Sequence, residues 1–555
     1  MSQRTVFFEN VTHAHRPWVG WFLFRGDQVH FFDFEPHLRA MGWLRRLLQQ
    51  ERIQRIYIPS ASQADSIAMD DAEGLFPQFS SHPLIQALGS LYSPEEAAPF
   101  FKKALLETRF RSVFIRRYLQ EYSRRNPHQR VLLIPEISCH WEPDNHRFCP
   151  PGVRALSAAI RIIQDAAYNT AISSALFLHL FFIRIGRLLS RKIRTEAAVH
   201  VYPVEQEFQV KFQKKRGFDF LLDGKILTKQ NTLFLVHPTG EGPWVQEAIR
   251  TGHRILRLSH FAQIRSPGGH LRNPPIHLKS GPLIKAALGF LLHPLTPRWI
   301  AEAAGRGLFV GMTHSALLER LKFKNYLYLN QEHLSQQWLN ILIRRAGRQS
   351  WNFAFAIGGG YLYRPQSEFG HRQRLWAYQN CDHFVSMSSQ LIRYHQAHPQ
   401  RTRFYHNVGN IWSEQIGSFS RGEIQQLRRE WFGPGAQDRK IISFFDTTFI
   451  EADNSPSTYS EALLWYRDIE RLLDEEKHLW AVLKPSRAAW RFVDHRARWA
   501  DPLGTEILNR WEVLKKHPRV YCAGDAGDPS AIIAASDLTV TFCFPRVRFS
   551  GNLYS

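Results

Sequence analysis

Polar and basic side chains follow the strands expected in the last part of the chain. Apolar runs at 440–445, 479–483 and 538–542 read as buried strands. The polar residues at their carboxyl ends are Asp446, Thr447, Thr448, Lys484, Ser486, Arg487 and Thr541. Because lysine and arginine neutralise phosphate oxygens, this set predicts a site for a nucleotide diphosphate, whose leaving charge the cations would stabilise.

The elements between these strands indicate how the polar residues come together. Helices are expected at about 460–477 and 529–536, and a further strand at 519–523. Strands that alternate with helices form a doubly wound parallel sheet, whose ligand crevice lies at the carboxyl ends of the strands. Gly433-Pro434-Gly435 interrupts the chain. Residues 431–555 are therefore predicted to form a Rossmann-like domain with the polar residues at its crevice.

A glycine-rich turn lies in the middle block, residues 200–430, which is predicted to be a second Rossmann-like domain. The run 232–237 reads as a buried strand, and Pro243 suits the first position of a helix. The turn between them contains His237, Thr239, Gly240, Glu241 and Gly242. Backbone N–H groups at such a turn bind anions, and His237 and Glu241 lie where a general base would be useful. A tight turn that needs two glycines for its geometry alone is the open alternative.

Positive charge is the main feature of the composition. The chain has 71 Lys and Arg against 49 Asp and Glu, a net charge of +22, which favours nucleic acid, anionic lipid or phosphorylated ligands. The segment 102–130 holds many of these basic residues, and its apolar residues recur every four positions, as in a helix with one apolar stripe. Two interpretations are open: the solvated face of a core helix, or a helix that lies on an anionic membrane.

Residues 151–199 are predicted to be mainly helical and to include a membrane-contacting segment. The stretch 166–183 carries no formal charge. The basic residues that follow it at once are Arg184, Arg187, Arg191, Lys192 and Arg194. Since the length only reaches the threshold for crossing a bilayer and polar residues interrupt it, a buried or interfacial helix is favoured over a spanning one.

The remaining sequence completes the expected fold class. Residues 1–150 read as an N-terminal α/β region, so the chain is expected to be α/β, with two Rossmann-like domains, this extra region and a helical insert. Five cysteines cannot form a disulfide framework, and no secretory signal is visible, which indicates a cytoplasmic protein. The spacing of Cys139-His140 and His146…Cys149 matches no usual zinc pattern, so no metal or cofactor is expected.

The last block resembles the donor-binding half of GT-B glycosyltransferases from bacterial surface-polysaccharide biosynthesis. The segments that carry this resemblance are FFDTT, VLKPSR, RVYCAGDAGDPSAIIAASDL and TVTFCFP. It implies that Lys484 or Arg487 contacts the donor phosphate. The block is also similar to surface-polysaccharide proteins with a Pro-Phe-Thr-Ser motif at the last strand end, where this chain reads Phe544-Pro545-Arg546-Val547. GT-B donor halves continue further than the 13 residues after Phe542, so an incomplete donor domain is expected.

The resemblance implies a glycosyltransferase that moves sugar from a nucleotide-sugar donor to a lipid-linked or polysaccharide acceptor. From their place at the glycine-rich turn, Glu241 or His237 is the expected base. The basic segments favour a position on the cytoplasmic face of the membrane. A polyol-phosphate transferase of the same fold is one alternative, although of the paired His-Pro motifs only His237-Pro238 is present. A basic nucleic-acid-binding protein is the other alternative, and no recognition motif supports it.

Overall fold

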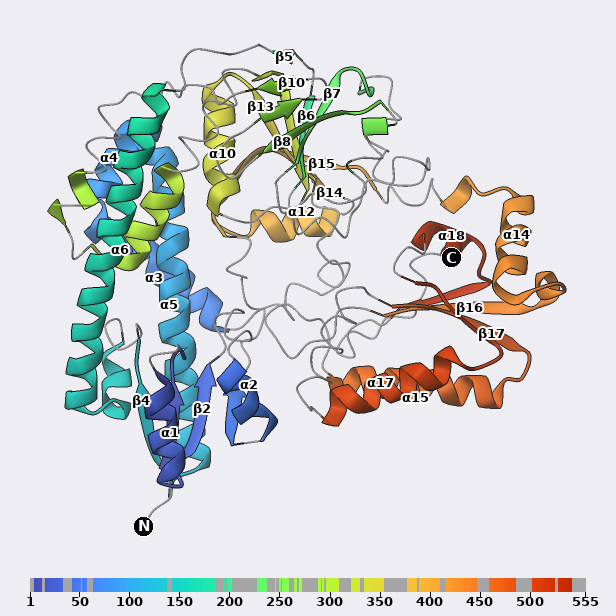
Figure 1. Cartoon of the computed structure of the whole chain (residues 1–555), viewed down its shortest axis with the longest axis horizontal. Coiled ribbons are helices and arrows are strands. Elements are labelled where there is room, and N and C mark those ends of the chain that lie inside the picture. Colours follow the sequence, from blue (N-terminus) through green and yellow to red (C-terminus); the bar gives the residue numbers. More distant parts are fainter. Residues whose placement is uncertain are drawn as a thin grey trace.

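Three large sheets, each mostly or entirely parallel, organise the computed structural model (Figure 1), and β5 (Ile193–Arg194) and β11 (Leu321–Lys322) form a small parallel pair besides them. The structure describes residues 4–11, 15–32, 42–50, 52–56, 63–136, 142–185, 193–194, 197–201, 227–236, 245, 249–250, 252–258, 264–266, 269–271, 288–290, 292–293, 296–308, 321–329, 334–353, 377–386, 389–409, 416–446, 459–485, 502–524 and 528–541. The chain is a mixed α/β protein, as the sequence predicts.

The N-terminal sheet consists of β1 (Arg4–Phe8), β2 (Gln28–Phe32), β3 (Ile53–Ile56) and β4 (Arg130–Ile134), in the order β3-β2-β1-β4 with every pair parallel. Helices α1 (Arg16–Phe24) and α2 (Gly42–Gln49) pack on one face. Helices α3 (Gln63–Phe79) and α5 (Pro94–Arg125) pack on the other. Because both faces are covered, β1 and β2 are each buried at four of five positions rather than at alternate ones.

Helix α5 is a buried helix and not a surface one over most of its length. Its apolar stripe lies in the core as expected, but Lys103 and Arg109 of its basic side are buried too. Arg109 pairs with Asp71 of α3 and with the buried Glu142, 2.7 Å away, and Lys103 lies 3.9 Å from Glu107. For Lys103 and Arg109 the interpretations of a solvated or membrane-facing basic side are therefore wrong, because both side chains are buried and two carboxylates remote in the sequence neutralise Arg109.

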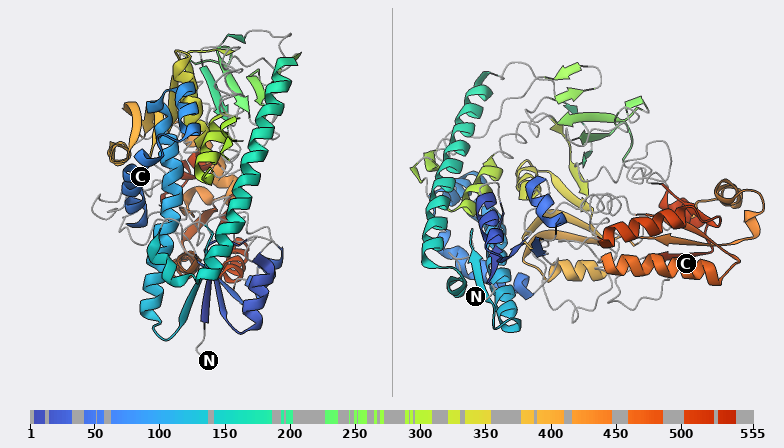
Figure 2. Two further views of the ribbon diagram at one scale, coloured as in Figure 1. Left: turned by 90° about the vertical axis from the view of Figure 1, so that its left-hand side faces the viewer. Right: turned by 60° about the horizontal axis from the view of Figure 1, so that its bottom comes forward.

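Helix α6 (Pro151–Ile185) runs along the outside of the α-helical layer (Figure 2). Its Ile172 packs against Gly305 of the helix at 298–308, and its Asn169 donates a hydrogen bond to the carbonyl of Thr296. The predicted helical segment 151–199 is thus mostly helix. In the part of the chain that the structure describes, no helix has the length and apolarity needed to cross a membrane.

The middle sheet has nine strands in the order β10-β9-β8-β7-β6-β12-β13-β14-β15. They are β6 (Ala197–Val201), β7 (Thr232–Val236), β8 (Arg254–Leu258), β9 (Ile264–Ser266), β10 (Gly269–Leu271), β12 (Asn325–Leu329), β13 (Gln349–Phe353), β14 (Gln379–Ser386) and β15 (Gln400–Asn407). The pairs from β8 through β15 are parallel, and β9 and β10 add an antiparallel edge. Counted along the chain, β8-β7-β6-β12-β13-β14 is the Rossmann order 3-2-1-4-5-6, so the predicted Rossmann-like fold is confirmed for this sheet.

The middle sheet and the N-terminal helices share one hydrophobic core. Trp338 of α10 (Leu334–Arg345) is fully buried, and its ring stacks on Phe100 of α5 at 3.9 Å. A Cβ on Gly307 would lie 2.6 Å from the Trp338 ring, so only glycine allows the helix at 298–308 to pack this closely. The Tyr92 hydroxyl at the end of α4 (Pro83–Tyr92) donates to the Gly307 carbonyl.

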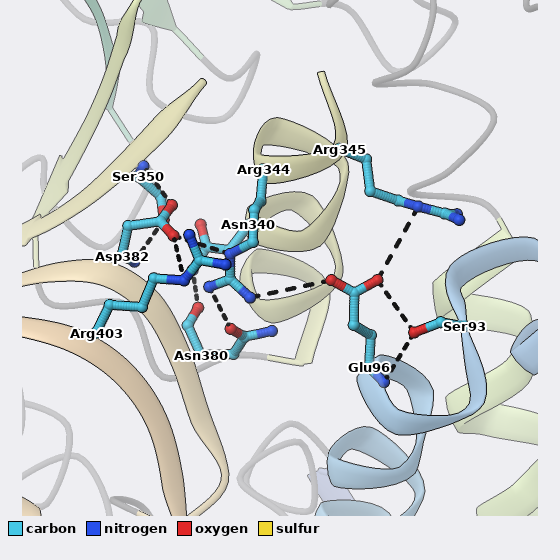
Figure 3. A network of polar contacts seen from close by, with 9 residues as sticks. All are labelled: Ser93, Glu96, Asn340, Arg344, Arg345, Ser350, Asn380, Asp382 and Arg403. Atoms are coloured by element: carbon cyan, nitrogen blue, oxygen red, sulfur yellow. Dashed lines mark hydrogen bonds and ion pairs between the residues drawn. The ribbon is translucent and has the colours of Figure 1, made fainter. Parts of the chain in front are cut away.

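A polar network at the amino ends of the middle strands completes this joint (Figure 3). Arg344 donates to the buried carboxylate of Asp382 at 2.8 Å and lies 4.0 Å from Glu96 of α5. The Ser350 backbone N–H and hydroxyl also donate to Asp382. Since ligands of parallel sheets bind at the carboxyl edge, this network at the opposite edge has a structural role.

The C-terminal sheet is made of β16 (Lys440–Phe445), β17 (Leu479–Lys484), β18 (Val520–Cys522) and β19 (Leu538–Thr541), all parallel, in the order β18-β17-β16-β19. Helices α15 (Tyr459–Glu475) and α17 (Pro502–Lys515) lie side by side on one face (Figure 2). Helices α14 (Arg421–Phe432) and α18 (Pro529–Ala534) cover the other face.

The start of this C-terminal unit lies before the predicted boundary at 430/431. That boundary falls inside α14, whose Trp431 and Phe432 pack against Tyr521 and Trp480 of the sheet. Helix α14 therefore belongs to the C-terminal unit. The expected incompleteness of the donor domain concerns residues after Thr541, which lie outside the described residues.

Candidate functional site

The strand order of the C-terminal sheet reverses beside β16. The chain passes from β16 outward to β17 and β18, and then crosses back so that β19 pairs with the other edge of β16. Such a reversal is a topological switch point, where the loops at the carboxyl ends of two neighbouring strands diverge and leave room for a ligand.

Three of the sequence-predicted residues meet at this switch point. Phe445, the last residue of β16, is in register with Lys484 of β17 on one side and with Thr541 of β19 on the other. Asp446 follows directly, and its backbone N–H donates to the Lys484 carbonyl at 3.3 Å. Asp446, Lys484 and Thr541 therefore lie at one level on three adjacent strands, as the sequence predicts.

Asp446 is held in place by a tyrosine that the sequence reading did not single out. The hydroxyl of Tyr466 in α15 donates to Oδ2 of Asp446 at 2.7 Å, and the Tyr466 ring is almost completely buried. Burial, and then the nearby Asp446 charge, raise the pKa of Tyr466 well above its ordinary value. Tyr466 consequently stays a neutral donor, and Asp446 keeps a fixed direction at the crevice.

Lys484 supplies the positive charge at this edge. Its Nζ lies 3.2 Å from the Pro485 carbonyl, which it contacts as a donor. A lysine and a carboxylate at the ends of neighbouring strands can bind two kinds of ligand group, because Lys484 attracts phosphate oxygens while Asp446 accepts hydrogen bonds from sugar hydroxyls.

The other predicted site residues lie outside the described residues. This applies to Thr447, Thr448, Ser486 and Arg487 of the C-terminal crevice. It also applies to His237, Thr239, Gly240, Glu241 and Gly242 of the middle block. The strand that leads to this second turn is observed as β7, next to β6 at the switch point between β6 and β12. Its predicted base and anion-binding turn stay predictions.

The N-terminal sheet has the same strand order and a switch point of its own between β1 and β4, which the sequence reading missed. Glu9 follows β1 and is fully buried, and its carboxylate accepts the Glu136 backbone N–H at 2.6 Å. The Asn10 side chain in turn donates to the Glu136 carboxylate at 2.7 Å. Because these groups bond one another and Glu9 has no exposed surface, they hold the sheet edge together.

Among the residues that the structure describes, no group of three or more His, Cys, Asp and Glu side chains is arranged to hold a metal ion. Of the Cys/His cluster named above, Cys139 and His140 lie outside the described part, and Cys149 packs in the hydrophobic core.

Known proteins similar to this chain fall into two groups. Residues 284–545 match the model of a family described as polysaccharide biosynthesis PFTS motif protein. This match covers β12 to β19 and ends at Pro545, in the stretch where the sequence suggested the Pro-Phe-Thr-Ser position. No curated protein matches the chain.

Solved structures of sugar-nucleotide enzymes are similar to it at low identity. One is S. aureus MnaA in a co-structure with UDP, at 11% identity over 63% of this chain and 74% of that one, with a TM-score of 0.33. A second is a putative UDP-N-acetylglucosamine 2-epimerase from Listeria monocytogenes, at 10% identity over 63% of this chain and 74% of that one, with a TM-score of 0.32. A third is an alpha,alpha-trehalose-phosphate synthase (UDP-forming) from Burkholderia vietnamiensis, at 12% identity over 62% of this chain and 77% of that one, with a TM-score of 0.29.

Because these TM-scores are low, the fold assignment rests on the strand orders of the sheets. The family match confirms the resemblance found in the sequence. Over residues 284–545, the chain is similar to the polysaccharide biosynthesis PFTS motif proteins, and this range includes strands of two Rossmann-like parallel sheets.

Proposed function

We propose that this chain is a glycosyltransferase of cell-surface polysaccharide biosynthesis. It would move a sugar from a nucleotide-sugar donor to a lipid-linked or polysaccharide acceptor on the cytoplasmic face of the membrane. The observation that carries the proposal is the meeting of Asp446, Lys484 and Thr541 at the switch point of the C-terminal sheet. The family match over 284–545 supports the same biological role.

The proposed reaction assigns a separate task to each group. A base, Glu241 or His237, removes the proton from an acceptor hydroxyl, whose oxygen then attacks the anomeric carbon of the donor sugar. The bond between that carbon and the donor phosphate oxygen breaks, and the nucleoside diphosphate leaves with the bonding electrons. Lys484, together with Arg487, neutralises the leaving phosphate, while Asp446 accepts hydrogen bonds from hydroxyl groups of the donor.

Replacing Lys484 with alanine tests the donor site. We expect the dissociation constant for the preferred nucleoside diphosphate to rise about 10- to 100-fold, because a charge-assisted phosphate contact is lost. Isothermal titration calorimetry with UDP, GDP and ADP measures this. Lys440→Ala is the matched control, since Lys440 is exposed at the opposite end of neighbouring β16 and should leave the affinity unchanged. Equal affinity in wild type and Lys484→Ala would sink the proposal.

Replacing Tyr466 with phenylalanine tests whether it positions Asp446. Tyr466→Phe and Asp446→Asn should each weaken binding of the sugar nucleotide several-fold, and the double variant should be no weaker than the more impaired single one, since both changes disrupt one contact. A merely structural role for Tyr466 predicts additive losses instead. Binding constants of the four proteins, compared with their melting temperatures, separate the two cases.

A further inference from the structure

Helix α1 is apolar around its whole circumference, although the protein covers only one of its faces. Val19 and Phe22 are buried against the N-terminal sheet. On the remaining surface, Trp18, Trp21 and Phe24 are 45%, 53% and 83% exposed. A helix that is apolar on all sides is normally buried on all sides, so the exposed part of α1 needs another explanation.

The three exposed side chains form one surface, which we call the α1 aromatic face. Trp18, Trp21 and Phe24 are spaced by three positions, which places them on neighbouring turns of one side of the helix. The rings of Trp21 and Phe24 stack with centroids 6.4 Å apart, and the Arg25 guanidinium lies 6.0 Å from the Trp21 ring. The face is therefore continuous and has a cation at its end.

The charges around this face suit an anionic surface. Arg16 begins the helix and Arg25 follows it, both are exposed, and no acidic residue lies within α1. The nearest carboxylate in sequence is that of Asp27, 3.9 Å from Arg25 and largely buried. Tryptophan favours the boundary between hydrocarbon and head groups, and arginine is attracted to anionic lipid.

Helix α6 carries a further set of exposed apolar side chains. Val153 in its first turn packs against the hydrophobic clusters on both faces of the N-terminal sheet. Leu156, Ile160 and Ile163 follow at spacings of four and three, and all are exposed. Among the described residues, α1 and α6 together carry eight of the fifteen exposed large apolar side chains.

The size of the α1 aromatic face decides between a lipid surface and a second copy of the chain. The exposed fractions of two tryptophans and one phenylalanine amount to roughly 400 Å². A stable protein interface buries about 800 Å² on each partner. By itself the α1 aromatic face supplies about half of that area, which favours a lipid surface, because side chains that enter the head-group region of a bilayer need no larger patch.

We propose that α1 docks this protein on an anionic membrane surface, with Trp18, Trp21 and Phe24 inserted among the lipids and Arg16 and Arg25 next to the head groups. This inference rests on the membrane position in the proposed function. It makes α1 the membrane-binding element in place of the basic segment of α5, part of which is buried. It is independent of donor binding, because α1 lies on the N-terminal sheet and Lys484 on the C-terminal one.

The test is co-sedimentation of the full chain with vesicles. Wild type should sediment with vesicles of equal parts phosphatidylcholine and phosphatidylglycerol, and much less with phosphatidylcholine alone. The triple variant Trp18→Ser, Trp21→Ser, Phe24→Ser should bind at least about tenfold more weakly. Phe24→Ser alone, at the most exposed position, gives a partial loss without threatening the fold. The control Leu464→Ser, Val513→Ser removes exposed apolar groups from the C-terminal unit and should bind as wild type does.

Two results would overturn the inference. One is that wild type and the triple variant sediment equally with the vesicles, or that wild type does not sediment with them. The other is a wild-type dimer in analytical ultracentrifugation that the triple variant converts to a monomer, which would make the face a protein interface. Nucleoside diphosphate affinity, measured on the same proteins without vesicles, should be the same for all of them. If wild type shows no measurable affinity for any nucleoside diphosphate, the donor site is refuted, while the vesicle result still tests the docking surface separately.

Discussion

Replacing Trp338 with alanine should lower the free energy of unfolding by about 3–5 kcal/mol, because a fully buried indole is removed from a tightly packed core. Trp338 joins α10 to Phe100 of α5 and to Tyr92 of α4, so the loss should be felt on both sides of this joint. Urea denaturation followed by circular dichroism measures the change in free energy.

Hydrogen exchange then shows how far the effect of Trp338→Ala extends. Amides of α5 and of β12 and β14 should lose protection together, since they share one core, while the C-terminal sheet has separate hydrophobic clusters and should keep its protection. Trp21→Ala, at a half-exposed site, is the control and should change stability by about 0.5 kcal/mol or less. Unchanged protection in α5 would contradict a shared core.

Replacing Glu142 with alanine should cost about 3–5 kcal/mol of stability. Glu142 is buried and accepts hydrogen bonds from Arg109 and Arg116, each at 2.7 Å, so its loss leaves cations inside the protein without a carboxylate they now share. A lower midpoint of urea unfolding, with an unchanged dependence of the free energy on urea concentration, measures this loss.

Glu121 provides the matched control for Glu142. It also pairs with two arginines, Arg124 and Arg125, but these lie exposed near the end of α5. Because water screens exposed pairs, Glu121→Ala should shift the urea midpoint far less than Glu142→Ala does. Equal effects of the two substitutions would mean that the Glu142 cluster is not a desolvated one.

Much of the C-terminal fold could be predicted from the sequence, because buried parallel strands are continuous apolar runs. The runs at 440–445, 479–483 and 538–542 correspond to β16, β17 and β19, and the polar residues expected at their ends include the three that meet. Strand order, by contrast, depends on long crossovers that leave no local pattern. The third Rossmann-like order, in the N-terminal sheet, was for that reason not predicted.

Partners from distant parts of the chain explain what the sequence could not show. Tyr466 occupies an apolar position of α15, and only the fold brings its hydroxyl to Asp446. The basic side of α5 looked solvated because Asp71 and Glu142, which neutralise Arg109, lie 38 and 33 residues away. The exposed side of α1 shows the reverse case, since its apolar composition predicts burial that the protein does not provide.

Protection of lysines from acetylation tests the central claim most directly. The protein is treated with an acetylating reagent with and without a saturating nucleoside diphosphate, and modification of each lysine is measured by mass spectrometry. Lys484, at the carboxyl edge of the C-terminal sheet, should be protected by the ligand, and Lys440, at the opposite edge, should react equally in both samples. Equal modification of Lys484 with and without ligand, while calorimetry shows the ligand bound, would contradict a donor site at this switch point.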